Sequence, residues 1–198
     1  MNNAPGWLTS DRKPRQILIE YSRKVPQDGV VLELGSLFGA TTQLLRTYLD
    51  PTCNIIVVDS WSDIQKDKLP DSLGDALIEI KNKEVTEVIP GDNVYKWWKL
   101  FTKDLENVTH FREDVLKVEK QNLPKVDLII QDAQHTYEGV LAELKYWWPQ
   151  LKKGGIIIID DYNWENYPGL CNAVDEFFSE KSYTTKTETT CFLLIIEK

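Results

Sequence analysis

Cysteines, long apolar runs and a leader segment are scarce or missing in this sequence, and each absence excludes a class of protein. The three cysteines, Cys53, Cys171 and Cys191, are odd in number and widely spaced. They predict reduced, packed thiols rather than a disulfide or zinc framework. No apolar run approaches the ~20 residues that span a bilayer. The first residues hold neither a basic nor an apolar leader segment, so we expect a cytoplasmic protein that is not exported.

Positive charge is also in short supply. Lys and Arg number 23 against 31 Asp and Glu, which leaves a net charge of −8. Charge of this sign repels phosphate groups, so we expect neither nucleic acid nor a membrane as the main partner. It suits a positively charged ligand instead, such as a metal ion.

The order of elements along the chain indicates one α/β domain spanning 1–198. Short runs of Val and Ile alternate with helical patterns, which predicts a Rossmann-like, doubly wound sheet that is mostly parallel and buried on both faces. The expected strands are 30–34, 55–58, 108–112, 126–130 and 156–159, the last after a turn at Gly154-Gly155, with a C-terminal antiparallel hairpin at 182–188 and 191–197. The expected helices are 12–24, 40–49, 93–105, 137–151 and 169–180.

One connection is much longer than the others. Almost fifty residues rich in charge separate strand 55–58 from strand 108–112. Connections of this length are usually functional or mobile. We expect residues 62–92 to form a partly helical insertion that could act as a lid over the ligand cleft.

Two glycines follow the first expected strand. Gly35 and Gly39 lie at the mouth of a helix, where backbone N–H groups can approach a polar ligand. The dinucleotide fingerprint Gly-x-Gly-x-x-Gly needs another glycine at position 37, which is Leu37 here. The spacing Glu33-x-Gly-x-x-x-Gly therefore favours a ligand without a pyrophosphate.

Acids also stand at the carboxyl ends of later strands, where ligands of such sheets bind. Asp59 ends the second strand, so its carboxylate could accept hydrogen bonds from two ribose hydroxyls of an adenosine-type ligand. The alternative for Asp59 is a turn cap. Asp114 follows the third strand and could cap a helix.

Three further carboxylates follow the fourth and fifth strands, namely Asp132, Asp160 and Asp161. Because these strands are expected to be neighbours, their acids converge and repel one another unless a cation lies between them. A hard divalent cation with oxygen ligands, most simply Mg²⁺, meets this need. Such an ion can bind a substrate hydroxyl and lower its pKa.

One of the two histidines in the sequence lies beside these acids. His135 follows Asp132 by three residues and could act as the general base for that hydroxyl. A purely structural histidine is the alternative.

Four segments together carry the pattern of a known family. They are Val31-Leu32-Glu33-Leu34-Gly35, Asp59-Ser60-Trp61, Asp132 to Val140, and Leu151-Lys152-Lys153-Gly154-Gly155 followed by Asp160-Asp161-Tyr162. In these segments the chain resembles small, metal-dependent class I O-methyltransferases that use S-adenosylmethionine (SAM). It is most similar to the methyltransferase domain 24 family, which includes the macrocin-type sugar O-methyltransferases. The resemblance covers about residues 28–162.

The resemblance implies roles for specific residues. The implied SAM-binding residues are Glu33, Gly35, Ser36, Gly39, Thr41, Asp59, Ser60, Trp61, Asp114, Val115 and Asp132. The implied metal ligands are Asp132, Asp160 and Asp161. His135, together with Asp132, is the implied catalytic pair, since it stands where catechol O-methyltransferase, a more distant relative, has a catalytic lysine. Trp164 and Tyr167 are expected beside the acceptor. Many relatives read Asp-x-Asp-His, and this chain has Gln134 in place of the second acid.

We therefore predict an enzyme that transfers a methyl group from SAM to a metal-bound hydroxyl of a sugar or small natural-product-like acceptor. Two alternatives stay open. One is a hydroxylase-type enzyme of the same fold, and the other is a non-catalytic SAM- or nucleoside-binding module, for which Gln134 is the one hint. The sequence does not identify the acceptor, and it leaves a homodimer open.

Overall fold

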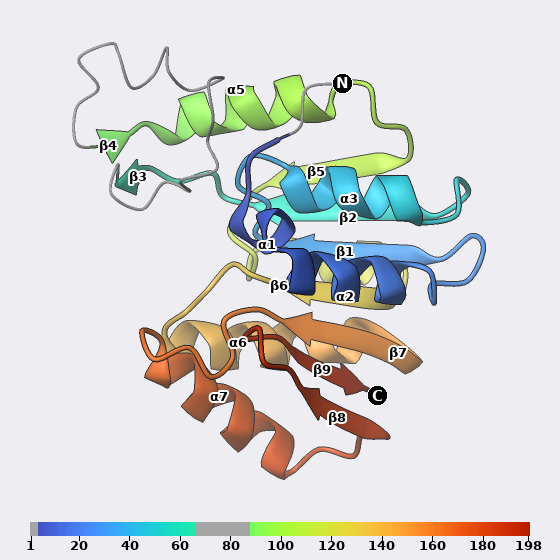
Figure 1. Cartoon of the computed structure of the whole chain (residues 1–198), viewed down its shortest axis with the longest axis vertical. Helices are drawn as coiled ribbons and strands as arrows, with labels where there is room; N and C mark the ends of the chain where they lie inside the picture. The colour runs from blue at the N-terminus through green and yellow to red at the C-terminus, as the bar shows by residue number, and fades with distance from the viewer. Residues whose placement is uncertain (1–3, 66–87) are drawn as a thin grey trace.

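A computed structural model of the chain describes residues 4–65 and 88–198. Its main sheet has the strand order β5-β2-β1-β6-β7-β9-β8 (Figure 1). The strands are β1 (Val30–Leu34), β2 (Asn54–Asp59), β5 (Val108–Arg112), β6 (Val126–Gln131), β7 (Leu151–Ile159), β8 (Thr185–Glu188) and β9 (Leu194–Glu197). The first five strands of this order run parallel, and β9 runs antiparallel to both of its neighbours. The predicted doubly wound sheet with a C-terminal hairpin is confirmed.

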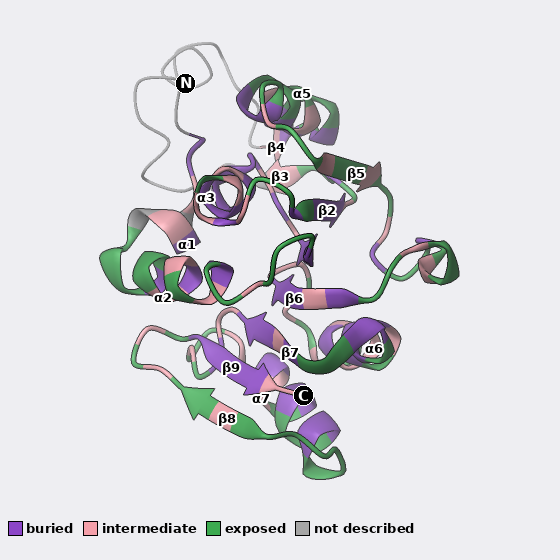
Figure 2. Cartoon of the chain, turned by 90° about the vertical axis from the view of Figure 1, so that its right-hand side faces the viewer, coloured by how far each residue is buried: buried purple, intermediate pink, exposed green. Residues whose placement is uncertain are grey.

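Helices cover both faces of the sheet, because successive strand residues point to opposite sides. Val31 and Ile55 belong to the core shared with α2 (Arg12–Ser22), α3 (Ala40–Tyr48) and α5 (Gly91–Thr102). Their neighbours Leu32 and Ile56 belong to the core shared with α6 (Tyr137–Trp147) and α7 (Pro168–Ser179). Figure 2 shows β9 and the carboxyl-terminal half of β7 mostly buried, and β8 mostly exposed at the edge of the sheet. Within the described ranges, no helix has the length and apolar character that a bilayer crossing requires.

Several predicted boundaries shift, and one assignment is wrong. Helix α6 ends at Trp147 and continues as a 3₁₀-helix over Trp148–Gln150, because Pro149 has no N–H to continue the α-helical hydrogen bonds. Gly154 and Gly155 lie inside β7 rather than in a turn before it. The pairing of β6 with β7 shifts register between Val126 and Leu128, so the two glycines occupy an irregularity within the strand.

Two features near the ligand-binding edge were not predicted. A short helix, α1 (Trp7–Ser10), precedes α2. The ends of the long insertion pair as a small antiparallel sheet of β3 (Ile64–Gln65) and β4 (Val88–Ile89). Residues 66–87 lie outside the described part of the chain, so the proposed lid over 62–92 stays a prediction.

The turns after β1 and β6 touch through their backbones. The amide of Asp132 donates to the carbonyl of Leu34 at 2.9 Å. Gly35 adopts φ +81°, and a Cβ at this position would lie 2.2 Å from the carbonyl oxygen of Asp132. Glycine is therefore required at position 35 for two independent reasons, the left-handed backbone and the lack of space.

We expect Gly35→Ala to lower the free energy of unfolding by more than about 2 kcal/mol, because it combines backbone strain with a steric clash. Gly154→Ala is the matched control. Gly154 has a similar φ of +75° with nothing within 4 Å of the added Cβ, so strain alone should cost about 1 kcal/mol. Urea unfolding of both variants measures the difference. Equal losses would contradict the close approach of the two turns.

Candidate active site

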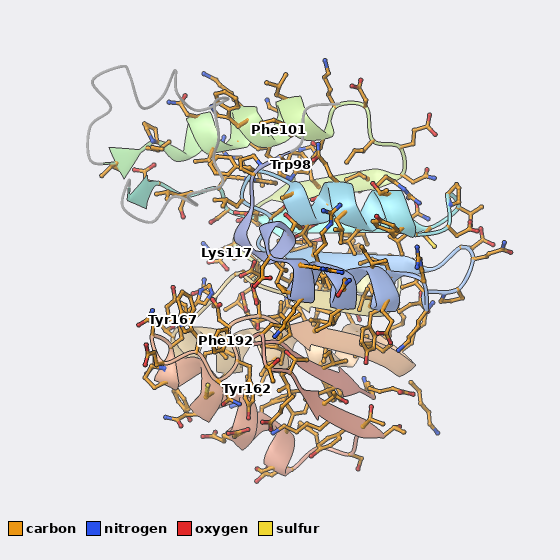
Figure 3. The ribbon with its side chains drawn as sticks, in the orientation of Figure 1. Trp98, Phe101, Lys117, Tyr162, Tyr167 and Phe192 are labelled. Atoms are coloured by element: carbon orange, nitrogen blue, oxygen red, sulfur yellow. The ribbon has the colours of Figure 1, made fainter. Side chains whose placement is uncertain are left out.

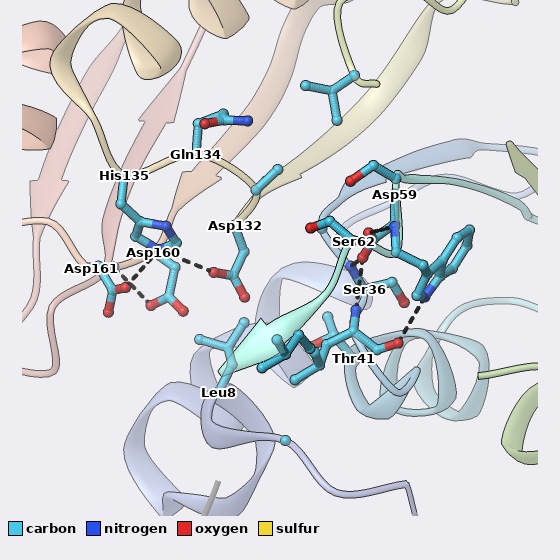
Figure 4. A pocket seen from close by; sticks show the side chains of 18 of the residues that line it. Leu8, Ser36, Thr41, Asp59, Ser62, Asp132, Gln134, His135, Asp160 and Asp161 are labelled. Carbon is cyan, nitrogen blue, oxygen red and sulfur yellow. Dashed lines mark hydrogen bonds and ion pairs between the residues drawn. The ribbon is translucent and has the colours of Figure 1, made fainter. Parts of the chain in front are cut away.

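A cavity of about 630 Å³ opens at the carboxyl ends of the parallel strands. Figure 4 shows its two halves, with Ser36, Thr41 and Asp59 on one side and Asp132, His135, Asp160 and Asp161 on the other. Nine of the predicted SAM-binding residues line it: Gly35, Ser36, Thr41, Asp59, Ser60, Trp61, Asp114, Val115 and Asp132. The sequence thus correctly predicted which strand ends meet.

Asp59 holds the glycine turn rather than only facing the cavity. One carboxylate oxygen, Oδ2, accepts hydrogen bonds from the backbone amides of Ser36 at 2.8 Å and Leu37 at 2.9 Å. The other, Oδ1, accepts from the amide of Trp61 at 2.6 Å. A carboxylate has about four acceptor sites, so three are occupied and one remains for a ligand. The turn-cap role of Asp59 is therefore observed, and the contact with the ribose hydroxyls stays a prediction.

Two tryptophans on either side of the predicted insertion, Trp61 and Trp98, support the same turn, which sequence reasoning missed. Trp98 of α5 donates its indole N–H to Ser36 Oγ at 2.9 Å. Trp61 donates its own to the carbonyl of Leu37 at 2.8 Å, and its ring packs 4.9 Å from that of Trp98. The predicted helix over 93–105 contains Trp98, but helical spacing could not show what its indole N–H would bind.

Glu33 and Gly39 stand behind the cavity wall. Glu33 is fully buried and accepts a hydrogen bond from Thr42 Oγ1 at 2.7 Å. Burial raises the pKa of Glu33 to about 7, and its second oxygen has no partner among the described residues. Gly39 has φ +90° and forms the N-cap of α3. Both residues support the turn from behind.

Asp114 has two functions in the structure. Its carboxylate accepts a hydrogen bond from the amide of Leu116 at 2.9 Å, which caps the turn after β5. The residue also lines the cavity, as does Val115 beside it. The contact with SAM that the resemblance implies for Asp114 is compatible with this position and stays a prediction.

His135 lies between two of the converging acids. Its Nε2 is 2.9 Å from Asp161 Oδ2 and 3.8 Å from Asp132 Oδ1. Asp132, His135 and Asp161 each offer one ligand atom, and these atoms all lie within 4.8 Å of one another. Asp160 is adjacent, and its Oδ1 accepts a hydrogen bond from the Asp161 amide at 2.9 Å. Asp161, rather than Asp160, therefore joins Asp132 and His135 in the group of candidate ligand atoms.

The acids raise one another's pKa. Burial raises the pKa of Asp132 well above its ordinary value, and the charges of Asp160 and Asp161 raise it further. Burial and the charge of Asp161 raise the pKa of Asp160 to about 7. The Asp132 side chain keeps 31% of its surface accessible, but that surface faces the cavity. This donor set fits a divalent cation, because an ion would remove the repulsion that now opposes ionisation.

The loop that carries Asp132 and His135 is held from below by a buried polar pair. Gln131 Nε2 donates to Glu143 Oε2 of α6 at 2.8 Å and to the carbonyl of Gln134 at 3.2 Å. Glu143 is 1% exposed. No motif marked Glu143, although an acid among the buried positions of an amphipathic helix is a signal that could have found it.

Other lining residues come from distant parts of the sequence. Pro5, Gly6 and Leu8 reach the cavity from the N-terminal segment, and Phe192 reaches it from the C-terminal hairpin. Trp164 and Tyr167 line it as expected. Figure 3 shows Tyr167 and Phe192 in the opposite half of the molecule from Trp98.

A seven-stranded sheet of this order, with a glycine turn and an acid at the ends of β1 and β2, defines a class I SAM-dependent methyltransferase. The family model described as a methyltransferase domain matches residues 32–162. Because this match covers more than half of the chain, the protein belongs to that SAM-dependent methyltransferase family. The resemblance identified from the sequence is thereby confirmed.

Solved structures with the same fold differ in what they methylate. The O-methyltransferase NovP aligns with a TM-score of 0.65 and 19% identity, covering 93% of this chain and 78% of its own. CalS11, a TDP-rhamnose 3'-O-methyltransferase of calicheamicin biosynthesis, has a TM-score of 0.61 and 16% identity, with 92% and 77% covered. An rRNA methylase from Streptococcus thermophilus has a TM-score of 0.62 and 14% identity, with 94% and 97% covered. Identities this low establish the fold and not the acceptor. No curated protein matches.

The buried carboxyl of Glu143 predicts a pH-dependent stability. Burial raises its pKa from the ordinary 4.5 to about 7, against the hydrogen bond from Gln131, which lowers it. The folded state therefore binds more protons than the unfolded state between these values, so the free energy of unfolding falls as the pH rises from about 4.5 to about 7.

We expect Glu143→Gln to remove up to about 3 kcal/mol of this pH dependence, since the amide keeps the hydrogen bond to Gln131 but does not titrate. Urea unfolding of the metal-free protein at pH 5 and pH 7.5 measures it. Glu106→Gln, a change at an exposed position, should retain the full dependence. An unchanged slope in Glu143→Gln would contradict the assignment.

Proposed function

We propose that this methyltransferase is a divalent-metal-dependent O-methyltransferase acting on a hydroxyl of a sugar or small natural-product-like acceptor. The main support is that one cavity is lined both by the glycine turn and by the acid cluster with His135. A methyl donor and a hydroxyl held by these two halves would face each other across it. The cavity volume lies within the range of about 300–1,000 Å³ typical of small-molecule sites, which supports a small acceptor rather than a macromolecule.

The cofactor half is built to bind SAM without a phosphate-binding loop. The turn from Gly35 to Leu37 is fixed by Asp59 on one side and by Trp98 on the other. The free acceptor site of Asp59 is offered to a ribose hydroxyl. Ordering the turn before the ligand arrives lowers the entropy cost of binding.

The acid cluster is the proposed metal site. Asp132, Asp160 and Asp161 would hold the ion, with Mg²⁺ favoured by an oxygen donor set. When bound, a divalent cation supplies Lewis acidity that lowers the pKa of an acceptor hydroxyl. The raised pKa values of Asp132 and Asp160 support this assignment, because ionised carboxylates in this cluster need a positive partner.

His135 is the proposed general base. Its Nε2 lies 2.9 Å from Asp161 Oδ2 and 3.8 Å from Asp132 Oδ1, beside the space where a metal-bound hydroxyl would lie. The ring is also fixed from the side by Tyr167, whose centroid lies 4.4 Å away. Asp161 and Tyr167 thus orient the base before the acceptor binds.

Metal dependence is tested by methyl transfer in a chelator, which should stop the reaction, with recovery on adding Mg²⁺ or Mn²⁺. Asp160→Asn should lower turnover by at least 10²-fold while the affinity for S-adenosylhomocysteine changes little, because the proposed ion contacts the acceptor and not the cofactor. Asp114→Asn, at the cofactor end, should show the reverse pattern. Full activity in the chelator would refute the metal site.

The role of His135 is tested by His135→Ala, which should lower turnover by about 10²–10⁴ and flatten the acid limb of the pH–rate profile. His110→Ala is the control for loss of an imidazole. His110 bonds the Tyr95 hydroxyl at 2.7 Å, away from the acids, so turnover at saturating SAM should persist. An unchanged rate in His135→Ala would leave the histidine a structural role.

A further inference from the structure

The half of the cavity beyond the acids is walled by aromatic rings. The ring of Trp164 stands edge-on to that of Tyr167, with centroids 5.0 Å apart at 88°. Trp164 also lies 6.4 Å from Phe192. Leu8 lines the same cavity and lies below Asp160 and Asp161 in Figure 4. This wall offers the apolar faces of three rings, together with the indole N–H of Trp164 and the hydroxyl of Tyr167.

Phe192 has an unfavourable backbone conformation. It has φ +60°, which is rare for a bulky residue, and 45% of its surface is exposed. Its carbonyl accepts a hydrogen bond from the Tyr162 amide at 2.8 Å, and the next residue, Leu193, is fully buried. An apolar ring fixed in place at the edge of a cavity is preorganised to contact a flat ligand.

The charge of the wall restricts the ligand further. Five carboxylates line the cavity, those of Asp59, Asp114, Asp132, Asp160 and Asp161. None of the lining residues that the structure describes is Lys or Arg. A divalent cation and the sulfonium of SAM would neutralise three of these charges at most. A phosphate or carboxylate on the acceptor would therefore lose its hydration without gaining a Lys or Arg partner among the described lining residues.

We propose that the acceptor is an uncharged aromatic hydroxyl compound whose ring packs against Tyr167, Trp164 and Phe192, and that acidic acceptors, nucleotide-linked sugars included, are rejected. This inference rests on the proposed function, because it assigns the aromatic wall to the acceptor of the methyl group. A phenolic ring presents two apolar faces to these side chains, and its hydroxyl would point to the acids.

A matched ligand pair tests the charge requirement. Calorimetry on the full chain, saturated with S-adenosylhomocysteine and Mg²⁺, would compare 4-methylcatechol with 3,4-dihydroxybenzoate, which share a ring and hydroxyl pair and differ in one negative charge. We expect 4-methylcatechol to bind at least tenfold more tightly, and UDP-glucose to show no binding. Comparable or tighter binding of either anion, or no binding of 4-methylcatechol, would overturn the inference. Preferential binding without any methyl transfer from SAM would instead overturn the proposed function and leave the binding site intact.

Phe192→Gly tests the aromatic wall without a folding penalty. Glycine favours the left-handed backbone, so the melting temperature should stay equal or rise. The dissociation constant for 4-methylcatechol should increase at least fivefold, and that for S-adenosylhomocysteine should not change. Asp28→Gly is the control, since Asp28 has φ +58° and precedes β1 at the opposite end of the sheet. Unchanged affinity for 4-methylcatechol in Phe192→Gly would show that the ring does not contact the acceptor.

Discussion

The backbone contact between the turns after β1 and β6 is the constraint on which the whole site depends. Gly35 donates its amide to the carbonyl of Val58, and the amide of Asp132 reaches Leu34. These bonds continue the sheet one residue beyond its strands. They bring the glycine turn so close to the backbone of Asp132 that only glycine fits at position 35. Every later feature of the site is positioned relative to this contact.

A second feature of the site is a set of buried acids whose pKa values are raised. Glu33 and Asp160 both have pKa values raised to about 7 by burial, and Asp132 is raised by its neighbours as well. Groups in such a state gain most from a positively charged ligand. The proposed cofactor and metal are both cationic, so the binding energy of each would come partly from relief of this repulsion.

Backbone strain gathers around the same cavity. Leu37, Trp61, Asp161 and Phe192 all have positive φ, and all four line it. Each of these residues has a backbone group that is hydrogen-bonded to another residue. The amide of Trp61, for example, donates to the carboxylate of Asp59. Strain of this kind fixes side chains that would otherwise adopt many conformations, and it points Asp161 and Phe192 toward the ligand space.

The sequence determined the sheet, the strand ends and the class of ligand. Alternation of Val and Ile runs with helical patterns reports burial, and in a parallel sheet the acids that end strands must share one edge. For this reason Asp132 and Asp161 could be grouped before their geometry was known. The spacing around Gly35 likewise favoured a ligand without a pyrophosphate, because this preference depends on local backbone requirements.

Only the tertiary structure determined which group each side chain contacts. Asp59 accepts three hydrogen bonds from backbone amides, and His135 lies closer to Asp161 than to Asp132. Leu8 and Phe192, nearly the whole chain apart, came to the same cavity. Periodicity reports which face a residue occupies but carries no information on rotamers or on contacts between distant segments. Those depend on how the completed layers pack, which no local pattern encodes.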